Sequence, residues 1–324
     1  MIRYNISSER GLFLVNSKII FMGTPQIAAD VLQALLNANA NISLVICQPD
    51  RKVGRKGTLQ ACPTKQLALQ YNIPVFQPEK IRNDFQRVVD EHADLIVTCA
   101  YGQIVPQEVL DAPKQGCVNL HGSLLPEYRG AAPIQRAIYD GKTVTGMSLM
   151  KMEAGMDTGP VAAMAKIEIE PSDNTTSLFE KMGKLAGELV VEHLDELLAG
   201  TLEFIPQDDS SATHADKISK EEEQLDLNMS DVQLLNTIRA LSYTPGGYVI
   251  ANHAKLKLLS VRYQPGETPG IGVFFALNKK QFAMGGHEGI FLLDEVQPEG
   301  KSMMKSADFL NGKGRSLINK KAGE

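Results

Sequence analysis

Short apolar segments that alternate with helical stretches constrain the fold of this chain more than any other feature. Strand-like segments cover residues 18–22, 42–48, 74–77, 94–100 and 116–120, and the residues between them carry apolar side chains at helical spacing. The nearly continuous apolar run over 94–100 is typical of a parallel strand that is covered on both faces. This order predicts an α/β fold, a doubly wound and mostly parallel sheet with right-handed crossovers.

The two ends of this region carry more local signals. Thr24 and Pro25 follow the first segment, so we expect Thr24 to be the N-cap of a helix whose first residue is Pro25. Residues 147–152 and 161–169 read as two strands with no helix between them, which predicts a strand pair at one end of the sheet. A long amphipathic helix is expected over 177–199.

The chain changes character after residue 200, where the sequence becomes polar, charged and poorly periodic up to residue 223. We therefore predict a first domain over 18–204, a linker over 205–223 and a second domain over 224–324. Residues 1–17 are mixed and polar, and we treat them as an N-terminal extension.

The second domain begins with a helix signal and continues with short strands. Ser230 and Gln233 have the spacing of a capping box in front of a helix over 231–241. Short strand signals separated by turns that are rich in Gly, Pro and Asn then predict a small β-barrel. These signals cover residues 248–250, 256–263, 272–276, 281–284 and 289–293.

The composition is that of an ordinary globular protein, with 43% hydrophobic and 22% charged residues. No apolar run is long enough to span a bilayer. Of the four cysteines, Cys47, Cys99 and Cys117 lie in apolar strand-like segments, which favours reduced, buried thiols and a reducing compartment. The six histidines form no metal-binding cluster, so we predict no metal.

The net charge of −5 argues against a generic nucleic-acid binder, but it is unevenly distributed. Residues 224–324 hold 12 Lys and Arg against 9 Asp and Glu, a balance of +3 that leaves −8 for the remainder. This local excess permits RNA binding without establishing it.

Asn119 lies in the strand-like segment 116–120 and His121 follows it directly, and we expect them to point to the same face because side chains alternate along a strand. They lie at the carboxyl end of a strand, the edge where open α/β sheets bind ligands. Asp157 lies in the turn Gly155–Gly159, which could bring its carboxylate close to another backbone. Together the three supply a hydrogen-bond donor, an imidazole and a carboxylate that can tune the imidazole, although an isolated Asn-x-His at a strand end is more often structural than catalytic.

A longer string around these residues carries a resemblance to a known family. Asn119-x-His121-Gly-Ser-Leu-Leu-Pro126-x-x-Arg129-Gly-Ala-Ala-Pro-Ile-Gln-Arg136 resembles the folate-dependent formyltransferases. Together with Gly155-Met-Asp-Thr-Gly159, it resembles the branch of that family that acts on methionyl-tRNA. The resemblance implies a Rossmann-like catalytic domain followed by an OB-like barrel. No GxGxxG fingerprint or P-loop is present, which argues against a nicotinamide-dependent oxidoreductase.

The resemblance implies transfer of the formyl group of 10-formyltetrahydrofolate, a co-substrate, to the amino group of methionine on initiator tRNA. Asn119 would then donate to the developing oxyanion, His121 would donate and move a proton, and Asp157 would hold the imidazole. We expect two segments to line the folate site, although the leucines could equally belong to the core. Their candidate residues are Ser123, Leu124, Leu125 and Pro126, with Tyr101, Gly102, Ile104 and Val105.

The basic loop after Gln48 corresponds, by resemblance, to a loop that enters the tRNA acceptor stem. Arg55 matches its key arginine, and Arg51, Lys52 and Lys56 are further candidate tRNA contacts. Without the resemblance, a solvated surface loop would be the ordinary reading. The family often carries a Trp-containing segment where this chain reads Ser-Tyr-Thr-Pro-Gly-Gly over 242–247, and the chain has no Trp.

Two other classes stay open at this point. One is a formyltransferase that acts on a different amine, such as a nucleotide aminosugar; the other is a non-catalytic RNA-binding protein on the same fold. We expect a cytoplasmic monomer without a membrane partner.

Overall fold

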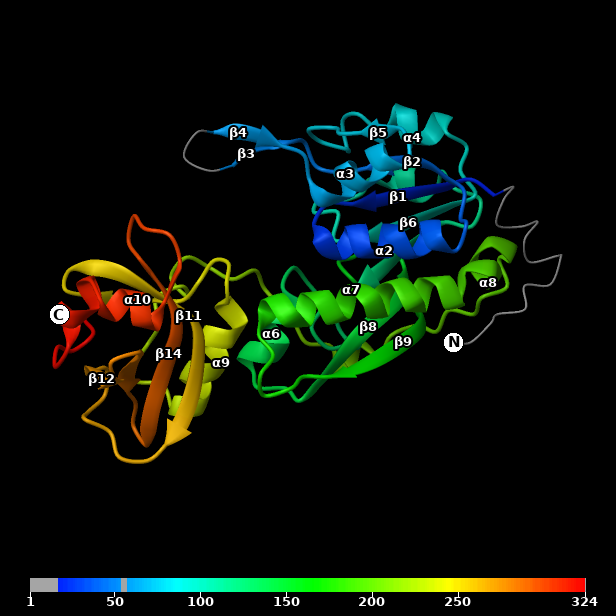
Figure 1. Ribbon diagram of the computed structural model, residues 1–324. Helices are drawn as coiled ribbons and strands as arrows, with labels where there is room; N and C mark the ends of the chain where they lie inside the picture. The colour runs from blue at the N-terminus through cyan, green and yellow to red at the C-terminus, as the bar shows by residue number, and fades with distance from the viewer. Residues whose placement is uncertain (1–16, 54–56, 324) are drawn as a thin grey trace. The chain divides into compact units, whose positions relative to one another are not determined.

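The computed structural model describes residues 17–53 and 57–323 (Figure 1). It divides into two compact units. The first holds the described residues up to Gly130, together with Thr145–Ile167 and Phe179–His214; the second holds Ala131–Val144, Glu168–Leu178 and the residues from Ala215 onward. The predicted boundaries at 204 and 223 stay a prediction. None of the described helices has the length and apolar character needed to cross a membrane.

The first unit is built on a seven-stranded sheet in the order β5-β2-β1-β6-β7-β8-β9. The pairs β1/β2, β2/β5, β1/β6 and β6/β7 are parallel, whereas β8 runs antiparallel to β7. The prediction of a doubly wound, mostly parallel sheet that ends in a strand pair is therefore confirmed. The strands are β1 (Ile19–Gly23), β2 (Ile42–Ile46), β5 (Val75–Phe76), β6 (Leu95–Cys99), β7 (Cys117–His121), β8 (Val144–Lys151) and β9 (Val161–Glu168).

Helices cover this sheet and bury its central strands almost completely. Residues of α4 (Gln86–Asp90) and α5 (Gln107–Leu110) share one hydrophobic core with alternate residues of β1, β2 and β6. α2 (Gln26–Asn37) contacts β1 and β6, with α3 (Pro63–Gln70) and α7 (Thr175–Glu192) packed beside it. Cys47, Cys99 and Cys117 are all buried free thiols, as predicted.

Two local predictions were wrong. α2 begins at Gln26, and its N-cap is Pro25. The Thr24 hydroxyl does not cap the helix, because it donates to the Tyr101 carbonyl (3.1 Å) and accepts from the Gln48 amide (3.2 Å). The helix expected over 177–199 is divided at residue 193 into α7 and α8 (Leu194–Ala199). The C-cap of α8 is Gly200, whose φ of +69° a glycine adopts without strain.

The second unit is organised around a six-stranded antiparallel sheet in the order β10-β11-β14-β13-β12, with β15 paired to β14. This confirms a separate β-rich C-terminal part, while the more specific OB-like barrel stays a prediction. The capping box of Ser230 and Gln233 is present at the start of α9. The strands are β10 (Tyr248–Ala251), β11 (Ala254–Pro265), β12 (Phe274–Asn278), β13 (Gln281–Gly285), β14 (Gly289–Pro298) and β15 (Met304–Lys305), and the α-helices are α6 (Pro133–Tyr139), α9 (Asp231–Leu241) and α10 (Ser306–Leu310).

An ion pair ties α6 to the segment that leads into α9 within this second unit. Arg136 donates from Nη1 to Glu222 Oε1 (2.6 Å) and from Nη2 to Glu222 Oε2 (3.1 Å). The Ser219 amide donates to the same carboxylate at 2.8 Å. The hydrogen bond from Arg136 is the main reason that the pKa of Glu222 falls to about 2, from an ordinary value of 4.5.

A Glu222→Gln variant tests this ion pair. A carboxylate with a lowered folded-state pKa contributes stability above its unfolded pKa, and this stability is lost as the pH falls from about 4.5 towards about 2. Because the carboxylate is partly solvated, we expect a loss of about 1 kcal/mol at pH 7. Urea unfolding followed by circular dichroism should show the difference from wild type shrinking by more than half at pH 3.

The matched control is Glu221→Gln, which removes the same charge from the exposed neighbouring side chain. It should leave the free energy of unfolding within about 0.5 kcal/mol of wild type. A Glu222→Gln loss that is the same at both pH values would contradict the assigned ion pair.

Candidate active site

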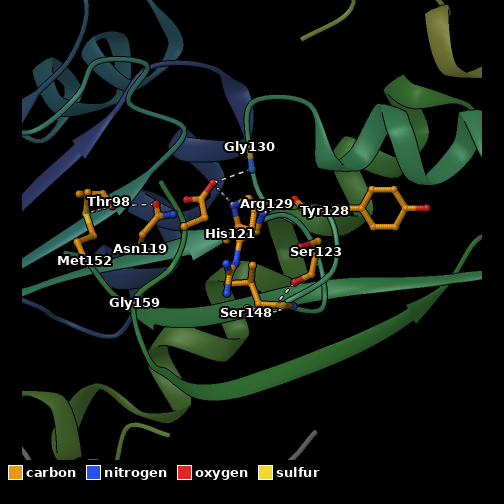
Figure 2. A network of polar contacts seen from close by, with 12 residues as sticks. Thr98, Asn119, His121, Ser123, Tyr128, Arg129, Gly130, Ser148, Met152 and Gly159 are labelled. Carbon is orange, nitrogen blue, oxygen red and sulfur yellow. Dashed lines mark hydrogen bonds and ion pairs between the residues drawn. The ribbon is translucent and has the colours of Figure 1, made fainter. Parts of the chain in front are cut away.

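Asn119 lies at the carboxyl end of β7, where its neighbour across the sheet is Thr98 of β6. The Thr98 hydroxyl is 2.8 Å from Asn119 Oδ1, 3.0 Å from the Val118 carbonyl and 3.2 Å from Met152 Sδ (Figure 2). A hydroxyl has one proton, and the shortest of these contacts is to the carboxamide oxygen. This contact fixes the amide plane and leaves Asn119 Nδ2 as the group that can donate to a ligand.

His121 is the last residue of β7, and its side chain is only 5% exposed. Its Nε2 lies 2.9 Å from the Tyr128 carbonyl, and its Nδ1 lies 3.6 Å from Asp157 Oδ2. A carbonyl only accepts, so Nε2 must carry a proton. The nitrogen that gains or loses a proton is therefore Nδ1, on the side of the ring that faces the carboxylate.

Asp157 lies in the turn Gly155–Gly159, where the Gly130 amide contacts its carboxylate and the Gln207 side chain contacts its backbone carbonyl. Its Oδ2 accepts a hydrogen bond from the Gly130 amide at 2.9 Å, so the turn does bring a carboxylate to another backbone, as the sequence predicted. Its own φ is +54°, a left-handed conformation that Asp tolerates better than most side chains. A Cβ atom at Gly159 would lie 2.0 Å from the Lys151 carbonyl oxygen, which explains the need for glycine there.

The structure thus brings together the three predicted catalytic side chains at one edge of the sheet. It also adds residues that the sequence analysis missed. Gln207 donates to the Asp157 and Gly159 carbonyls and accepts from Arg129, although it lies in the segment predicted as a linker. A polar residue in an unperiodic run gives no sequence signal of its partners, so this contact could be found only from the three-dimensional structure.

The predicted folate-lining residues divide by burial. Tyr101 and Val105 belong to the core cluster of β1, β2 and β6, and Leu125 is buried with Met150 and Val161. Gly102 is exposed, Leu124 and Pro126 are partly buried, and the Ile104 side chain is 83% exposed. Ile104 lies in the loop that follows β6, so it offers an apolar surface beyond the carboxyl end of the strand next to β7.

Ser123 is buried, and it organises the chain that follows β7. Its hydroxyl donates to the Glu127 carbonyl at 2.6 Å. The Ser148 hydroxyl of β8 donates to the Ser123 carbonyl (2.7 Å) and accepts from the Leu125 amide (3.0 Å). These contacts fix the course of the segment between His121 and Arg129, so the structure gives Ser123 a role in shaping the site.

The basic loop is an antiparallel hairpin of β3 (Arg51–Val53) and β4 (Thr58–Gln60). Arg51 and Lys52 are exposed on it, whereas Arg55 and Lys56 lie outside the described residues. Asp50 anchors the base of the hairpin, since it accepts from Lys65 Nζ (2.7 Å) and Gln77 Nε2 (2.8 Å). The hydrogen bonds from Gln77 and Lys65 lower the pKa of Asp50.

No cluster of three or more potential metal ligands of the His, Cys, Asp and Glu type occurs within residues 17–53 and 57–323. The polar groups at this edge of the sheet are the Asn119 amide, the His121 imidazole and the Asp157 carboxylate. This set suits a carbonyl carbon attacked by an amine, because one group can donate to the oxygen while the others handle a proton.

Comparison with known proteins identifies the family. Residues 17–194 match the Formyl transferase family, and residues 217–314 match the Formyl transferase, C-terminal domain family. A methionyl-tRNA formyltransferase of Latilactobacillus sakei is 43% identical over 305 residues, which cover 93% of this chain and 96% of the relative. One from Staphylococcus epidermidis is 40% identical over 307 residues, covering 94% and 99%.

Solved structures show the same fold at low sequence identity. HypX from Aquifex aeolicus, in complex with tetrahydrofolic acid, superposes with a TM-score of 0.67 at 18% identity, over 93% of this chain and 48% of that one. Two family matches that together span most of the chain, and full-length relatives at 40% identity or above, agree with the geometry of the site. The chain belongs to the methionyl-tRNA formyltransferase family.

Proposed function

We propose that this chain transfers the formyl group of 10-formyltetrahydrofolate to the amino group of methionine on initiator tRNA, with Asn119, His121 and Asp157 as its catalytic residues. The observation that carries the proposal is the convergence of these side chains at the carboxyl edge of β7. Asn119 presents an amide donor that is fixed by Thr98, and the His121 imidazole faces the Asp157 carboxylate at 3.6 Å. The reaction belongs to translation initiation, so we place the chain in the cytoplasm, acting as a monomer.

Asn119 stabilises the negative charge that develops during attack. The neutral amine forms a new bond to the formyl carbon, and the electron pair of the carbonyl moves to its oxygen. Asn119 Nδ2 donates to that oxygen because Thr98 holds the other end of the amide. When the bond between the formyl carbon and N10 breaks, its electron pair goes to N10, and the carbonyl forms again on the product.

His121 and Asp157 handle the proton. The attacking amine loses one proton, and N10 must gain one, so a group between them has to accept and return it. His121 Nδ1 is the available position, since Nε2 is committed to the Tyr128 carbonyl. A carboxylate 3.6 Å away stabilises the imidazolium that forms, and the Gly130 amide keeps that carboxylate in place.

The residues at this edge fit a folate donor. The exposed Ile104 side chain can cover one face of a flat pterin ring. Residues Leu124 to Pro126 follow β7, the strand next to β6 in the sheet. The donor must present its N10 formyl group to Asn119, and this requires the ring to lie beyond the ends of β6 and β7. A protein with the same fold, HypX from Aquifex aeolicus, was solved in complex with tetrahydrofolic acid, which supports a folate as the donor here.

The basic hairpin gives the tRNA substrate a contact near the catalytic edge. It leaves the carboxyl end of β2 and carries Arg51 and Lys52 in its described part. Phosphate contacts from such side chains supply affinity, while unpaired bases at the acceptor end supply specificity. We include Arg55 and Lys56, which lie between β3 and β4 in the sequence, by their resemblance to the family's tRNA-binding loop.

The decisive experiment is formyl transfer from 10-formyltetrahydrofolate to methionine-charged tRNA, with initiator and elongator tRNA assayed in parallel. We expect product with initiator tRNA and far less with elongator tRNA. A nucleotide aminosugar is added as a third acceptor. Transfer to the sugar alone would replace the proposed function with the aminosugar alternative, and folate binding without any transfer would disprove the catalytic role.

Asn119→Ala removes the proposed oxyanion donor. Losing one such donor typically lowers the rate by about 10²–10³, and we expect kcat to fall by that order. Steady-state formyl transfer at saturating concentrations of both substrates measures the effect. Thermal unfolding should be unchanged, because Asn119 is partly exposed and the Thr98 hydroxyl can donate to the Val118 carbonyl, 3.0 Å away, in its place.

The matched control for this variant is Asn83→Ala, an exposed residue in the turn before α4. It should retain wild-type turnover. An Asn119→Ala protein that turns over at a near-normal rate would remove Asn119 from the mechanism.

A double variant, Arg51→Ala with Lys52→Ala, tests the hairpin as a phosphate-binding element. The logarithm of the binding constant falls with the logarithm of salt concentration by about 0.9 per phosphate contacted in a duplex. We expect the double variant to reduce this slope by about 2 and to weaken tRNA binding at low salt. Filter binding of initiator tRNA at several salt concentrations provides the measurement.

A control that removes the same charge elsewhere on this unit is Lys114→Ala with Lys184→Ala, both of which are exposed. Lys114 precedes β7, at the opposite edge of the sheet from the hairpin. Equal slopes for the two double variants would show that net charge, rather than the hairpin, accounts for the effect.

A further inference from the structure

The segment 205–214 was predicted as part of a linker, but in the structure it runs across the candidate active site. Ile205 forms an antiparallel bridge with Val161 at the start of β9, with both backbone hydrogen bonds at 2.9 Å. At the other end, the Arg129 amide donates to the Thr213 carbonyl (2.9 Å), and the Tyr128 amide donates to Thr213 Oγ1 (2.8 Å). The segment is therefore fixed at both ends to the elements that carry the catalytic residues.

Gln207 lies between these two anchor points, and its side-chain amide is fully used. Nε2 donates to the Asp157 carbonyl at 2.8 Å and to the Gly159 carbonyl at 2.7 Å. Oε1 accepts from Arg129 Nε at 3.0 Å and from Arg129 Nη2 at 2.9 Å. Two donated and two accepted bonds are the full capacity of a carboxamide, so its orientation is determined from both sides.

The turn that Gln207 holds is exposed in its first part and buried only at its last residue. Gly155 and Thr158 are exposed and the Met156 side chain is 67% exposed, whereas Gly159 is buried and the Asp157 carboxylate accepts from the Gly130 amide. Asp157 also has a left-handed backbone, which costs about 1–2 kcal/mol in a residue with a Cβ atom. Hydrogen bonds to the carbonyls of Asp157 and Gly159 hold the turn on either side of the residue that must face His121.

Arg129 holds the other side of the amide. Its side chain is about 6% exposed, and Nη2 makes a further contact of 2.7 Å to Asp209, whose own side chain is 82% exposed. The guanidinium has no acceptor atoms, so it forces Oε1 of residue 207 towards itself and Nε2 towards the turn. A buried cation and two backbone carbonyls together require an amide at this position.

We infer that Gln207 is a positioning residue that sets the Asp157 carboxylate opposite His121 Nδ1, an inference that rests on the proposed function. It does not touch the substrates in this assignment. It acts on the rate because a displacement of about 1 Å in a catalytic group can cost about 10²-fold. The segment that contains it is thus a component of the catalytic site, not only a connection between two parts of the chain.

Gln207→Glu removes the two hydrogen bonds that Gln207 Nε2 donates, while it keeps the side-chain length and the acceptor for Arg129. Glutamate has the same length, and its carboxylate can still accept from the guanidinium, but its second oxygen would face two carbonyl oxygens. We expect kcat to fall by about 10- to 100-fold, with KM for both substrates within about twofold of wild type. Gln207→Met, which removes the donors without adding charge, should give a loss of similar size.

The charge-matched control is Gln70→Glu, which adds the same charge at an exposed position at the end of α3. It should leave kcat unchanged. An unchanged kcat for Gln207→Glu, or a change in KM or in the midpoint of thermal unfolding without a change in kcat, would overturn the inference. A failure of the wild-type protein to formylate methionyl-tRNA in the same assay would instead overturn the proposed function.

A double-mutant cycle identifies the residue through which Gln207 acts. If its effect on the rate passes through Asp157, adding Gln207→Met to Asp157→Asn should lower kcat by less than about twofold further. Single-turnover formyl transfer measures these slow variants. If the fold-losses of the two substitutions multiply, Gln207 acts independently of Asp157, and the positioning role is disproved.

Discussion

The contact between Thr98 and Asn119 depends on the parallel register of β6 and β7, and the rest of the site is arranged around it. The register pairs these residues directly, and every residue of the two strands is buried except Asn119, which is partly exposed. A close-packed sheet interior gives the amide a fixed support, so its donor direction is set by the fold and not by the ligand. Reorganisation during the reaction is thereby reduced, which is the general advantage of donors built on strands.

His121 shows how burial and hydrogen bonding divide the roles of one ring. Its Nε2 is held by a backbone carbonyl inside the protein, and this fixes both the ring and its tautomer. Its Nδ1, the nitrogen to which we assign the proton transfer, faces a carboxylate that comes from a different segment, 36 residues later in the chain. The two halves of the proton-handling pair have no shared element, so their distance depends on how the Gly155–Gly159 turn is held.

The sequence predicted the parts of the fold that local patterns determine. Continuous apolar runs placed the central strands, and strand alternation placed Asn119 and His121 on one face. The flanking glycines indicated that Asp157 approaches another backbone. Gln207 could not be found in this way, because its partners Arg129 and Asp157 lie 78 and 50 residues earlier, and its own stretch has no periodicity.

The wrong prediction for Thr24 also arose because its partners are distant in the sequence. Thr24 has the residue type and position of an N-cap, but its hydroxyl is used by Tyr101 and Gln48 from two other strand ends. The side chains of Tyr101 and Val105 are buried in the core, and the contact of these residues with a folate stays a prediction. Local sequence gives a residue's preferences, whereas competition among distant partners decides which preference is met.

A chain with a net charge of −5 can bind an RNA substrate through a few basic side chains that lie close together. Charges on a protein surface act over about 8 Å at physiological ionic strength, so the summed charge of the chain matters less than the charges that reach the phosphates. Arg51 and Lys52 project on a hairpin whose base is anchored through Asp50, Lys65 and Gln77. In the proposed function, these two side chains contact the phosphates of the tRNA while the net charge of the whole chain stays negative. This arrangement favours association through one defined surface, which is what a transferase needs to bring a single acceptor end to a single catalytic edge.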